Sequence, residues 1–128
     1  MNPLIESLSR ILPARQVITD NLRRLAYGTD ASFYRLTPEV VAVVEAEEEV
    51  QALLQAAQAH ARPVTFRAAG TSLSGQAVTD GVLALIGEGF ATCEIGPDAA
   101  TVRLGPGIIG GEVNFRLAPF GRKIGPDP

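Results

Sequence analysis

Residues 68–75 form a run of small side chains that directly follows a strand-like segment. The run reads AAGTSLSG, and Leu73 is its one bulky member. Small side chains let another molecule approach the backbone closely, and successive backbone N–H groups in a turn form a concave site that binds anions. Thr71, Ser72 and Ser74 would add hydroxyl donors to these N–H groups. This combination of residue types predicts a loop that binds phosphate.

The composition of this loop indicates which kind of phosphate it would hold. A Walker-type loop needs a lysine, and this loop has none. It also lacks carboxylates that would hold a magnesium ion. Neutral donors alone suit a diphosphate that is bound but not cleaved, which points to a dinucleotide cofactor. The alternative is a tight structural loop in which Gly70 and Gly75 only serve turns.

A second glycine motif lies further along the chain. Residues 105–110 read GPGIIG, which matches the G-x-G-x-x-G fingerprint of dinucleotide-binding folds, and Asp127 follows about 20 residues later. The fingerprint requires a preceding strand that belongs to a βαβ unit. Here the preceding strand is expected to pair as a hairpin, and GRKIGPDP does not read as a second strand. We therefore interpret GPGIIG as a turn between a strand and a helix, with nicotinamide binding as the alternative.

The elements around both motifs predict an α+β fold, with a small parallel sheet and helices followed by the start of an antiparallel sheet. Residues 40–46 are β-branched and apolar on both faces, as in a buried parallel strand. Residues 47–61 carry apolar side chains at helical spacing, and the strand expected at 62–66 completes a βαβ unit. A third strand is expected at 81–86, after the small-residue loop. The remaining expected elements are helices at 3–11, 19–26 and 110–121, a loop at 27–39, and an antiparallel hairpin of 91–95 and 101–105.

Two further predictions concern single helices. Leu4, Leu8 and Ile11 are expected to share the buried face of the first helix, because they fall at helical spacing. Thr19 or Asp20 is expected to cap the second helix, since both side chains carry an oxygen that accepts a backbone N–H group.

Composition restricts the classes of function. The chain has 128 residues, which predicts a single domain. Its net charge of −3 gives no reason to expect a nucleic-acid partner. One histidine and one cysteine argue against a histidine-based metal site, a histidine triad and an internal disulfide. His60 is expected at the surface, and Cys93 is expected to be a buried small hydrophobic residue. Tyr27 and Tyr34 are interpreted as packing residues and Asp30 as a turn former.

Three segments together resemble the FAD-binding domain of the vanillyl-alcohol oxidase type, also called the PCMH type. They read RAAGTSLSGQAVTDGV (67–82), YGTDASFYRLTPEVV (27–41) and VRLGPGIIGGEVNFRLAPFGRKIGPDP (102–128), so the resemblance covers nearly the whole chain. Within this family the chain is most similar to FAD-linked oxidases and dehydrogenases of 2-hydroxy acids, such as D-lactate dehydrogenase and the FAD subunit of glycolate oxidase. We expect an N-terminal helical segment (1–26) before the N-terminal portion of the FAD-binding domain (27–128), truncated at its C-terminus.

The resemblance also implies which residues bind the cofactor. Ala68 and Ala69 stand where many relatives have glycine, which implies that these positions do not need a positive φ. Thr71 stands where some relatives link FAD covalently through a histidine, so non-covalent FAD is expected. The implied FAD-binding residues are Arg67, Ala68, Ala69, Gly70, Thr71, Ser72, Gly75 and Gln76 in the loop, Pro106 and Gly107 after the hairpin, and Pro126 and Asp127 near the end of the chain.

The same resemblance implies a function for the parent protein. It would oxidise a D-2-hydroxy acid such as D-lactate or glycolate and pass electrons to a quinone, a cytochrome or an iron–sulfur centre through the rest of the protein. No residue of this chain is a candidate catalyst, and catalytic residues are expected beyond Pro128. The alternative is a non-catalytic fragment or a dinucleotide-binding module. The expected location is the cytoplasm or the periphery of the inner membrane.

Overall fold

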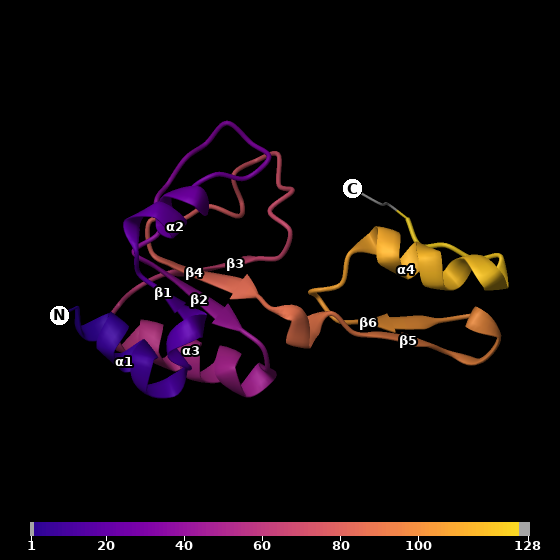
Figure 1. Ribbon diagram of the computed structural model, residues 1–128, viewed down its shortest axis with the longest axis horizontal. Coiled ribbons are helices and arrows are strands. Elements are labelled where there is room, and N and C mark those ends of the chain that lie inside the picture. Colours follow the sequence, from indigo (N-terminus) through magenta and orange to yellow (C-terminus); the bar gives the residue numbers. More distant parts are fainter. Residues whose placement is uncertain (1, 126–128) are drawn as a thin grey trace.

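A four-stranded sheet forms the centre of the N-terminal part of the chain in this computed structural model (Figure 1). The structure describes residues 2–125. The strands lie in the order β1-β2-β4-β3, in which β2, β4 and β3 run parallel and β1 runs antiparallel to β2. Their bounds are Val17–Ile18 (β1), Val40–Val44 (β2), Val64–Arg67 (β3) and Val82–Ile86 (β4).

The parallel part of this sheet confirms the predicted class of fold. β2 and β4 pair in register from Val40 opposite Val82 to Val44 opposite Ile86. Along β2 the side chains of both faces are buried, and Val43 is the one that stays partly exposed. Burial on both sides explains why this strand contains no polar residue.

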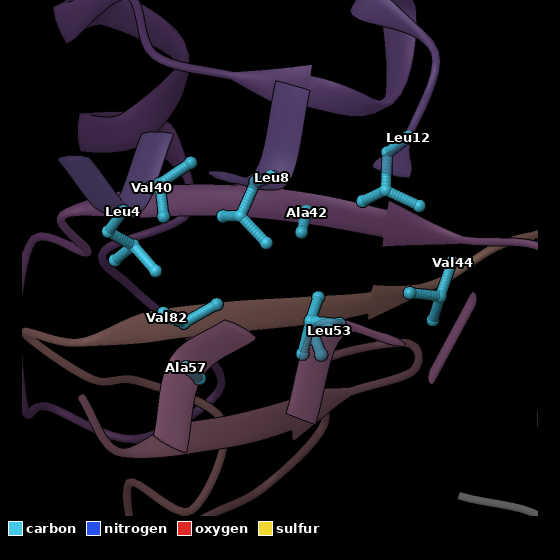
Figure 2. Close-up of a cluster of buried hydrophobic side chains, with 10 residues drawn as sticks. Leu4, Leu8, Leu12, Val40, Ala42, Val44, Leu53, Ala57 and Val82 are labelled. Atoms are coloured by element: carbon cyan, nitrogen blue, oxygen red, sulfur yellow. The ribbon is translucent and has the colours of Figure 1, made fainter. Parts of the chain in front are cut away.

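Two helices cover one face of the sheet (Figure 2). They are α1 (Pro3–Ile11), which Asn2 caps by accepting the Leu4 N–H group at 2.9 Å, and α3 (Glu47–Ala59). Side chains from both helices meet alternate residues of β2 and β4 in one buried hydrophobic cluster, which removes their apolar surface from water. The cluster contains Leu4, Leu8, Leu12, Val40, Ala42, Val44, Leu53, Ala57, Val82 and Ala84.

One predicted core position of α1 is wrong. The helical spacing places Ile11 on the buried face, but this side chain is 39% exposed, whereas Leu12 is only 4% exposed. α1 ends at Ile11, and Leu12 is extended, with φ −122° and ψ 146°. The change in backbone direction turns Leu12 into the core, which a helical period cannot predict because the period stops with the helix.

The second predicted helix is α2 (Asn21–Ala26), and the structure identifies its cap. Asp20 accepts the Arg23 N–H group at 3.0 Å, so the carboxylate and not the Thr19 hydroxyl satisfies the first turn. The helix has no buried residue, and it lies on the side of the sheet away from α1 and α3 (Figure 1).

Two features of the sheet were not predicted from the sequence. The sheet is mixed rather than parallel, because the short strand β1 pairs antiparallel with β2. In addition, β2 and β3 are not neighbours, since β4 lies between them and pairs with both. A strand of two residues is too short for a detectable period. Strand order depends on pairing between distant segments, which local sequence patterns do not report.

The connection between β3 and β4 joins neighbouring parallel strands without a helix. Such strands need a connection of a dozen or more residues, because the chain must return to the other end of the sheet. Residues 68–81 form this connection, so the predicted phosphate-binding loop begins at the carboxyl end of β3. Figure 1 shows it on the same side of the sheet as the 27–39 loop.

A hairpin and a helix form the C-terminal part of the described chain (Figure 1). The hairpin consists of β5 (Cys93–Ile95) and β6 (Val102–Leu104), which pair antiparallel as predicted. α4 (Gly110–Leu117) covers it, and apolar side chains from both form a small separate core. Cys93 is only partly buried at the edge of this core, so its side chain is less enclosed than predicted.

The last predicted helix ends earlier than residue 121. α4 stops at Leu117, and a 3₁₀ turn follows at Ala118–Phe120. Pro119 has no backbone N–H group and therefore cannot continue the α-helical hydrogen bonds, which explains the change.

Candidate functional site

The small-residue loop has the backbone conformations that its composition predicts. Gly70 has φ +72° and Gly75 has φ +75°, in the region that side chains with a Cβ atom rarely adopt. Ala68 and Ala69 are not among the described residues with a positive φ. The alanines that replace family glycines therefore stand where no glycine is needed, as predicted.

Backbone N–H groups of this loop have no partner among the described residues. Within residues 2–125, no hydrogen bond is donated by the N–H groups of residues 68–73. Ala68, Ala69 and Thr71 are exposed, and Gly70 and Ser72 are half-buried. Folded chains pair most of their buried backbone donors, whereas exposed donors such as these stay available to water or to a ligand. A row of accessible, unused donors is what an anion-binding loop requires.

The hydroxyl group of Ser72 closes the loop. Its oxygen accepts the N–H groups of Ser74 at 3.2 Å and of Gln76 at 3.1 Å. The same hydroxyl donates to the side-chain oxygen of Gln76 at 3.3 Å. Ser72 and Gln76, both predicted site residues, thus contact each other where the row of N–H groups ends.

Arg67 folds against the loop and binds main-chain carbonyl groups. Its Nη1 atom donates to Thr29 O at 2.6 Å, with longer contacts to Tyr27 O at 3.3 Å and Ala77 O at 3.5 Å. The guanidinium carbon lies 5.6 Å from the centre of the Tyr27 ring, a cation–π contact. A Cβ atom added to Gly70 would lie 2.5 Å from Nη2 of Arg67. This predicted site residue therefore joins the loop to a segment far away in the sequence.

That segment, residues 27–35, contacts the loop at several points, and we call it the anchor segment. The Ala31 N–H group donates to Gly70 O at 3.1 Å. The Tyr34 ring packs on the other glycine, since a Cβ atom on Gly75 would lie 2.8 Å from Tyr34 Cδ2. Tyr34 therefore has the packing role predicted for it.

Asp30 forms the predicted turn and also contacts the end of the loop. Its Oδ1 atom accepts the N–H group of Ser32 at 2.8 Å and the Ser32 hydroxyl. Its Oδ2 atom accepts the Ala77 N–H group at 3.4 Å. The Ser32 hydroxyl, these backbone N–H groups and the charge of Arg67 together hold the pKa of Asp30 below its ordinary value.

Removing the charge of Asp30 is expected to lower stability at neutral pH but not in acid. A carboxylate whose pKa is lower in the folded state stabilises the fold above its unfolded-state pKa, and this contribution is lost as the pH falls through the folded-state pKa. Asp30→Asn should therefore have a smaller free energy of unfolding than the wild type at neutral pH, with the difference disappearing below the usual aspartate range. Urea unfolding at several pH values measures it, and a difference that does not change with pH would contradict the prediction.

An apolar cleft of about 400 Å³ lies next to the loop. Two predicted site residues line it, Ala68 from the loop and Pro106 from the turn after β6. Gly107 lies close by, where its N–H group donates to Phe90 O at 3.0 Å and an added Cβ atom would lie 3.0 Å from a backbone oxygen. The other lining residues are Glu47, Val50, Phe66, Ile86 and Phe90. Pro126 and Asp127, the remaining predicted site residues, lie outside the described residues.

The other chemically reactive residues do not join this site. His60 is half-buried at the end of α3, where Nε2 lies 2.8 Å from the Ser7 hydroxyl. Residues 105–110 follow a strand paired as a hairpin, which agrees with reading GPGIIG as a turn. Within residues 2–125, no group of histidine, cysteine and acidic side chains is arranged to hold a metal ion. In the same range, no helix is both long and apolar enough to cross a membrane.

The anchor segment is the part of the site that sequence reasoning missed. Thr29 lies 38 positions from Arg67, and Asp30 lies 47 positions from Ala77. Contacts over such separations leave no local period in the sequence. The available signal is the density of turn formers in YGTDAS, which predicts a loop but not its neighbour.

Comparison with known proteins places this site in a family. Residues 38–128 match the family described as FAD binding domain. D-2-hydroxyglutarate dehydrogenase of Escherichia coli K12 is 32% identical over 108 residues, which are 81% of this chain and 11% of that protein. The glycolate oxidase subunit GlcD of the same strain is 28% identical over 128 residues, 98% of this chain and 26% of that protein. The chain thus spans only a minor part of either relative.

A solved structure shows the same fold. Alkyldihydroxyacetonephosphate synthase matches with a TM-score of 0.77 at 18% identity, over 100% of this chain and 29% of that one. The matched family region contains the loop, the hairpin and all the residues that line the cleft. The chain therefore belongs to the FAD-binding domain family of FAD-linked oxidoreductases and has the PCMH-type fold.

Proposed function

We propose that this chain holds the diphosphate of FAD in an oxidoreductase whose substrate is a D-2-hydroxy acid. The observation that carries the cofactor site is the row of unused N–H groups in residues 68–73. The substrate class is supported by two relatives, one named a D-2-hydroxyglutarate dehydrogenase and the other a subunit of glycolate oxidase. The activity of the whole protein is part of the proposal, because the chain spans 11% and 26% of these relatives.

The residues present fit the chemistry of FAD. The loop from residue 68 to residue 77 contains no acidic side chain that would repel two phosphate groups. Arg67 supplies positive charge close behind it. The adjoining cleft is mainly apolar, which suits a planar ring system. Glu47 also lines that cleft and would repel phosphate there, so the diphosphate belongs on the loop and a ring or sugar in the cleft.

Each predicted site residue has a role in this proposal. The backbone of residues 68–72 would bind the diphosphate, and Gly75 and Gln76 would close the loop around it. Pro106 and Gly107 would contact the cofactor from the hairpin side, and Pro126 and Asp127 are proposed as further contacts. FAD supplies the hydride acceptor when it is bound. The chain itself binds and orients the cofactor, and other parts of the protein would supply the groups that move the substrate proton.

Anaerobic titration of the full-length protein tests this function. We expect D-lactate, glycolate or D-2-hydroxyglutarate to remove the visible flavin absorbance, with L-lactate as the stereochemical control that leaves it unchanged. Acid precipitation of the same sample should release all of the flavin, and chromatography should identify it as FAD, because Thr71 cannot form the covalent link that a histidine forms.

Each contrary outcome removes a different part of the proposal. A full-length protein without flavin, even after FAD is added, would overturn the cofactor site. Bound FAD that no D-2-hydroxy acid reduces would overturn the substrate class and favour a non-catalytic FAD-binding module. Flavin that stays in the acid precipitate would contradict non-covalent binding.

A further inference from the structure

We infer that Arg67 and Asp30 are positioning residues that tie the anchor segment to the two ends of the loop, so that the N–H groups of residues 68–72 face the cofactor's diphosphate. The inference rests on the function proposed above for this loop. The family resemblance implies that Arg67 contacts the cofactor. In this inference Arg67 acts instead by holding the backbone of the loop in place.

The contacts of Arg67 fix the beginning of the loop. Its Nη1 atom donates to Thr29 O at 2.6 Å, which is a short hydrogen bond from a charged donor. Within the described residues Arg67 forms no ion pair, so its guanidinium is directed to carbonyl oxygens rather than to a carboxylate. The packing of the guanidinium against Gly70 leaves the loop little room to collapse onto the sheet.

The bond between Ala31 and Gly70 orients the middle of the loop. Ala31 N–H donates to Gly70 O at 3.1 Å, so this carbonyl group points toward the anchor segment. The C=O and N–H groups of a planar trans peptide point in opposite directions. The N–H group of Thr71 therefore points away from the anchor segment, toward the side where a ligand can reach it. A loop without this bond would be free to turn the carbonyl oxygen outward, where it would repel phosphate.

The contacts of Asp30 fix the end of the loop. Its Oδ2 atom accepts the Ala77 N–H group at 3.4 Å, and Ala77 O lies 3.5 Å from Nη1 of Arg67. The N–H group of Ala77 is thus directed to Asp30 and its C=O group to Arg67. Since Ser32 holds the other carboxylate oxygen, the Asp30 side chain has a defined direction. The preorganised loop would bind the diphosphate without first paying the entropy of ordering itself.

A second explanation of Arg67 makes a different prediction for a lysine variant. If Arg67 acted only as a positive charge near the diphosphate, Arg67→Lys would retain FAD affinity. A lysine ammonium could reach the carbonyl groups that Nη1 contacts, but lysine lacks the planar group whose Nε, Cζ and Nη2 atoms pack against Gly70 and which lies over the Tyr27 ring. If Arg67 positions the loop, Arg67→Lys should therefore bind FAD more weakly than the wild type.

The test uses the full-length protein with FAD removed and measures two quantities. The first is the dissociation constant for added FAD, which we expect to rise about tenfold or more in Arg67→Lys, the effect of one charge-assisted hydrogen bond. The second is amide hydrogen exchange of Ala31 and Ala77 without FAD, which should become faster because their partners are no longer held. Arg103→Lys, at an exposed position of β6, is the matched control and should change neither quantity.

Two results would overturn the inference. Wild-type FAD affinity in Arg67→Lys would show that charge alone suffices. Weaker affinity with unchanged exchange at Ala31 and Ala77 would show that Arg67 is a direct ligand. A wild-type protein that binds no FAD would instead overturn the proposed function, and the wild-type titration separates this failure from the other two.

Asp30→Asn provides an independent variant if Arg67→Lys does not fold. Asparagine keeps the shape of the side chain and one oxygen for Ser32, but its amide group cannot accept the Ala77 N–H group. We expect weaker FAD binding together with faster exchange of the Ala77 amide. Unchanged FAD affinity in this variant would contradict the role of Asp30.

Discussion

Gly70→Val is expected to abolish FAD retention while leaving a folded protein. Gly70 has φ +72°, which costs a residue with a Cβ atom about 1–2 kcal/mol. In addition, the new Cβ atom would lie 2.5–2.7 Å from three atoms of the Arg67 guanidinium. The guanidinium would have to move and give up its bond to Thr29 O. The row of N–H groups would then lose its shape at its centre.

Gly121→Val is the matched control, because it introduces the same backbone strain without a clash. Gly121 has φ +63°, and no atom lies within 4 Å of its added Cβ atom among the described residues. Both variants should therefore lose similar stability from strain. After gel filtration, the flavin-to-protein ratio should be near zero for Gly70→Val and unchanged for Gly121→Val. Stoichiometric FAD in purified Gly70→Val would mean that the diphosphate binds elsewhere.

Leu53→Ala is expected to cause the largest loss of stability among the substitutions considered. Leu53 is 0% exposed and packs in the cluster between α1, α3 and the sheet (Figure 2). Truncating a fully buried leucine removes transfer free energy and leaves a cavity, with a cost of about 2–5 kcal/mol. This is a large part of the 5–15 kcal/mol or so that typical domains have in total.

Leu54→Ala is the control from the same helix. Leu54 is 42% exposed, so its truncation changes the same residue type at the next position with little burial to lose. We expect a loss well below that of Leu53→Ala, about 1 kcal/mol or less. Urea unfolding without FAD measures the free energy of unfolding of each variant. Equal losses for the two variants would mean that the cluster around Leu53 does not stabilise the fold as its burial implies.

Predictions from the sequence succeeded where one short segment carries the information. The apolar run of β2 predicts a strand buried on both faces, and the acidic first turn and apolar spacing of α3 predict a helix. In the loop, Gly70 and Gly75 have positive φ, and Ala68 and Ala69 do not. These features follow from the residues themselves, because backbone preference and side-chain size act locally.

Sequence patterns made no prediction, or a wrong one, where a neighbour distant in the sequence decides the outcome. β1 forms only because Val17 and Ile18 meet the edge of β2. Leu12 is buried because the chain leaves α1 in an extended conformation over the sheet. β4 lies between β2 and β3 although it follows both in the chain. None of these outcomes has a signal in a window of a few residues, since each depends on how complete elements pair and pack.

The candidate site shows the same division. The small, uncharged residues of the loop and their place after a strand were enough to predict a diphosphate-binding backbone, because a loop of such residues exposes its own N–H groups. The direction in which those groups point depends on the anchor segment, whose bonds to the loop join residues 38 and 47 positions apart. Hydrogen bonds form between groups that the fold brings within about 3 Å, whatever their separation in the chain. The family resemblance places Arg67 at the start of the loop, but only the folded chain could show that Arg67 and Asp30 connect the loop to the anchor segment.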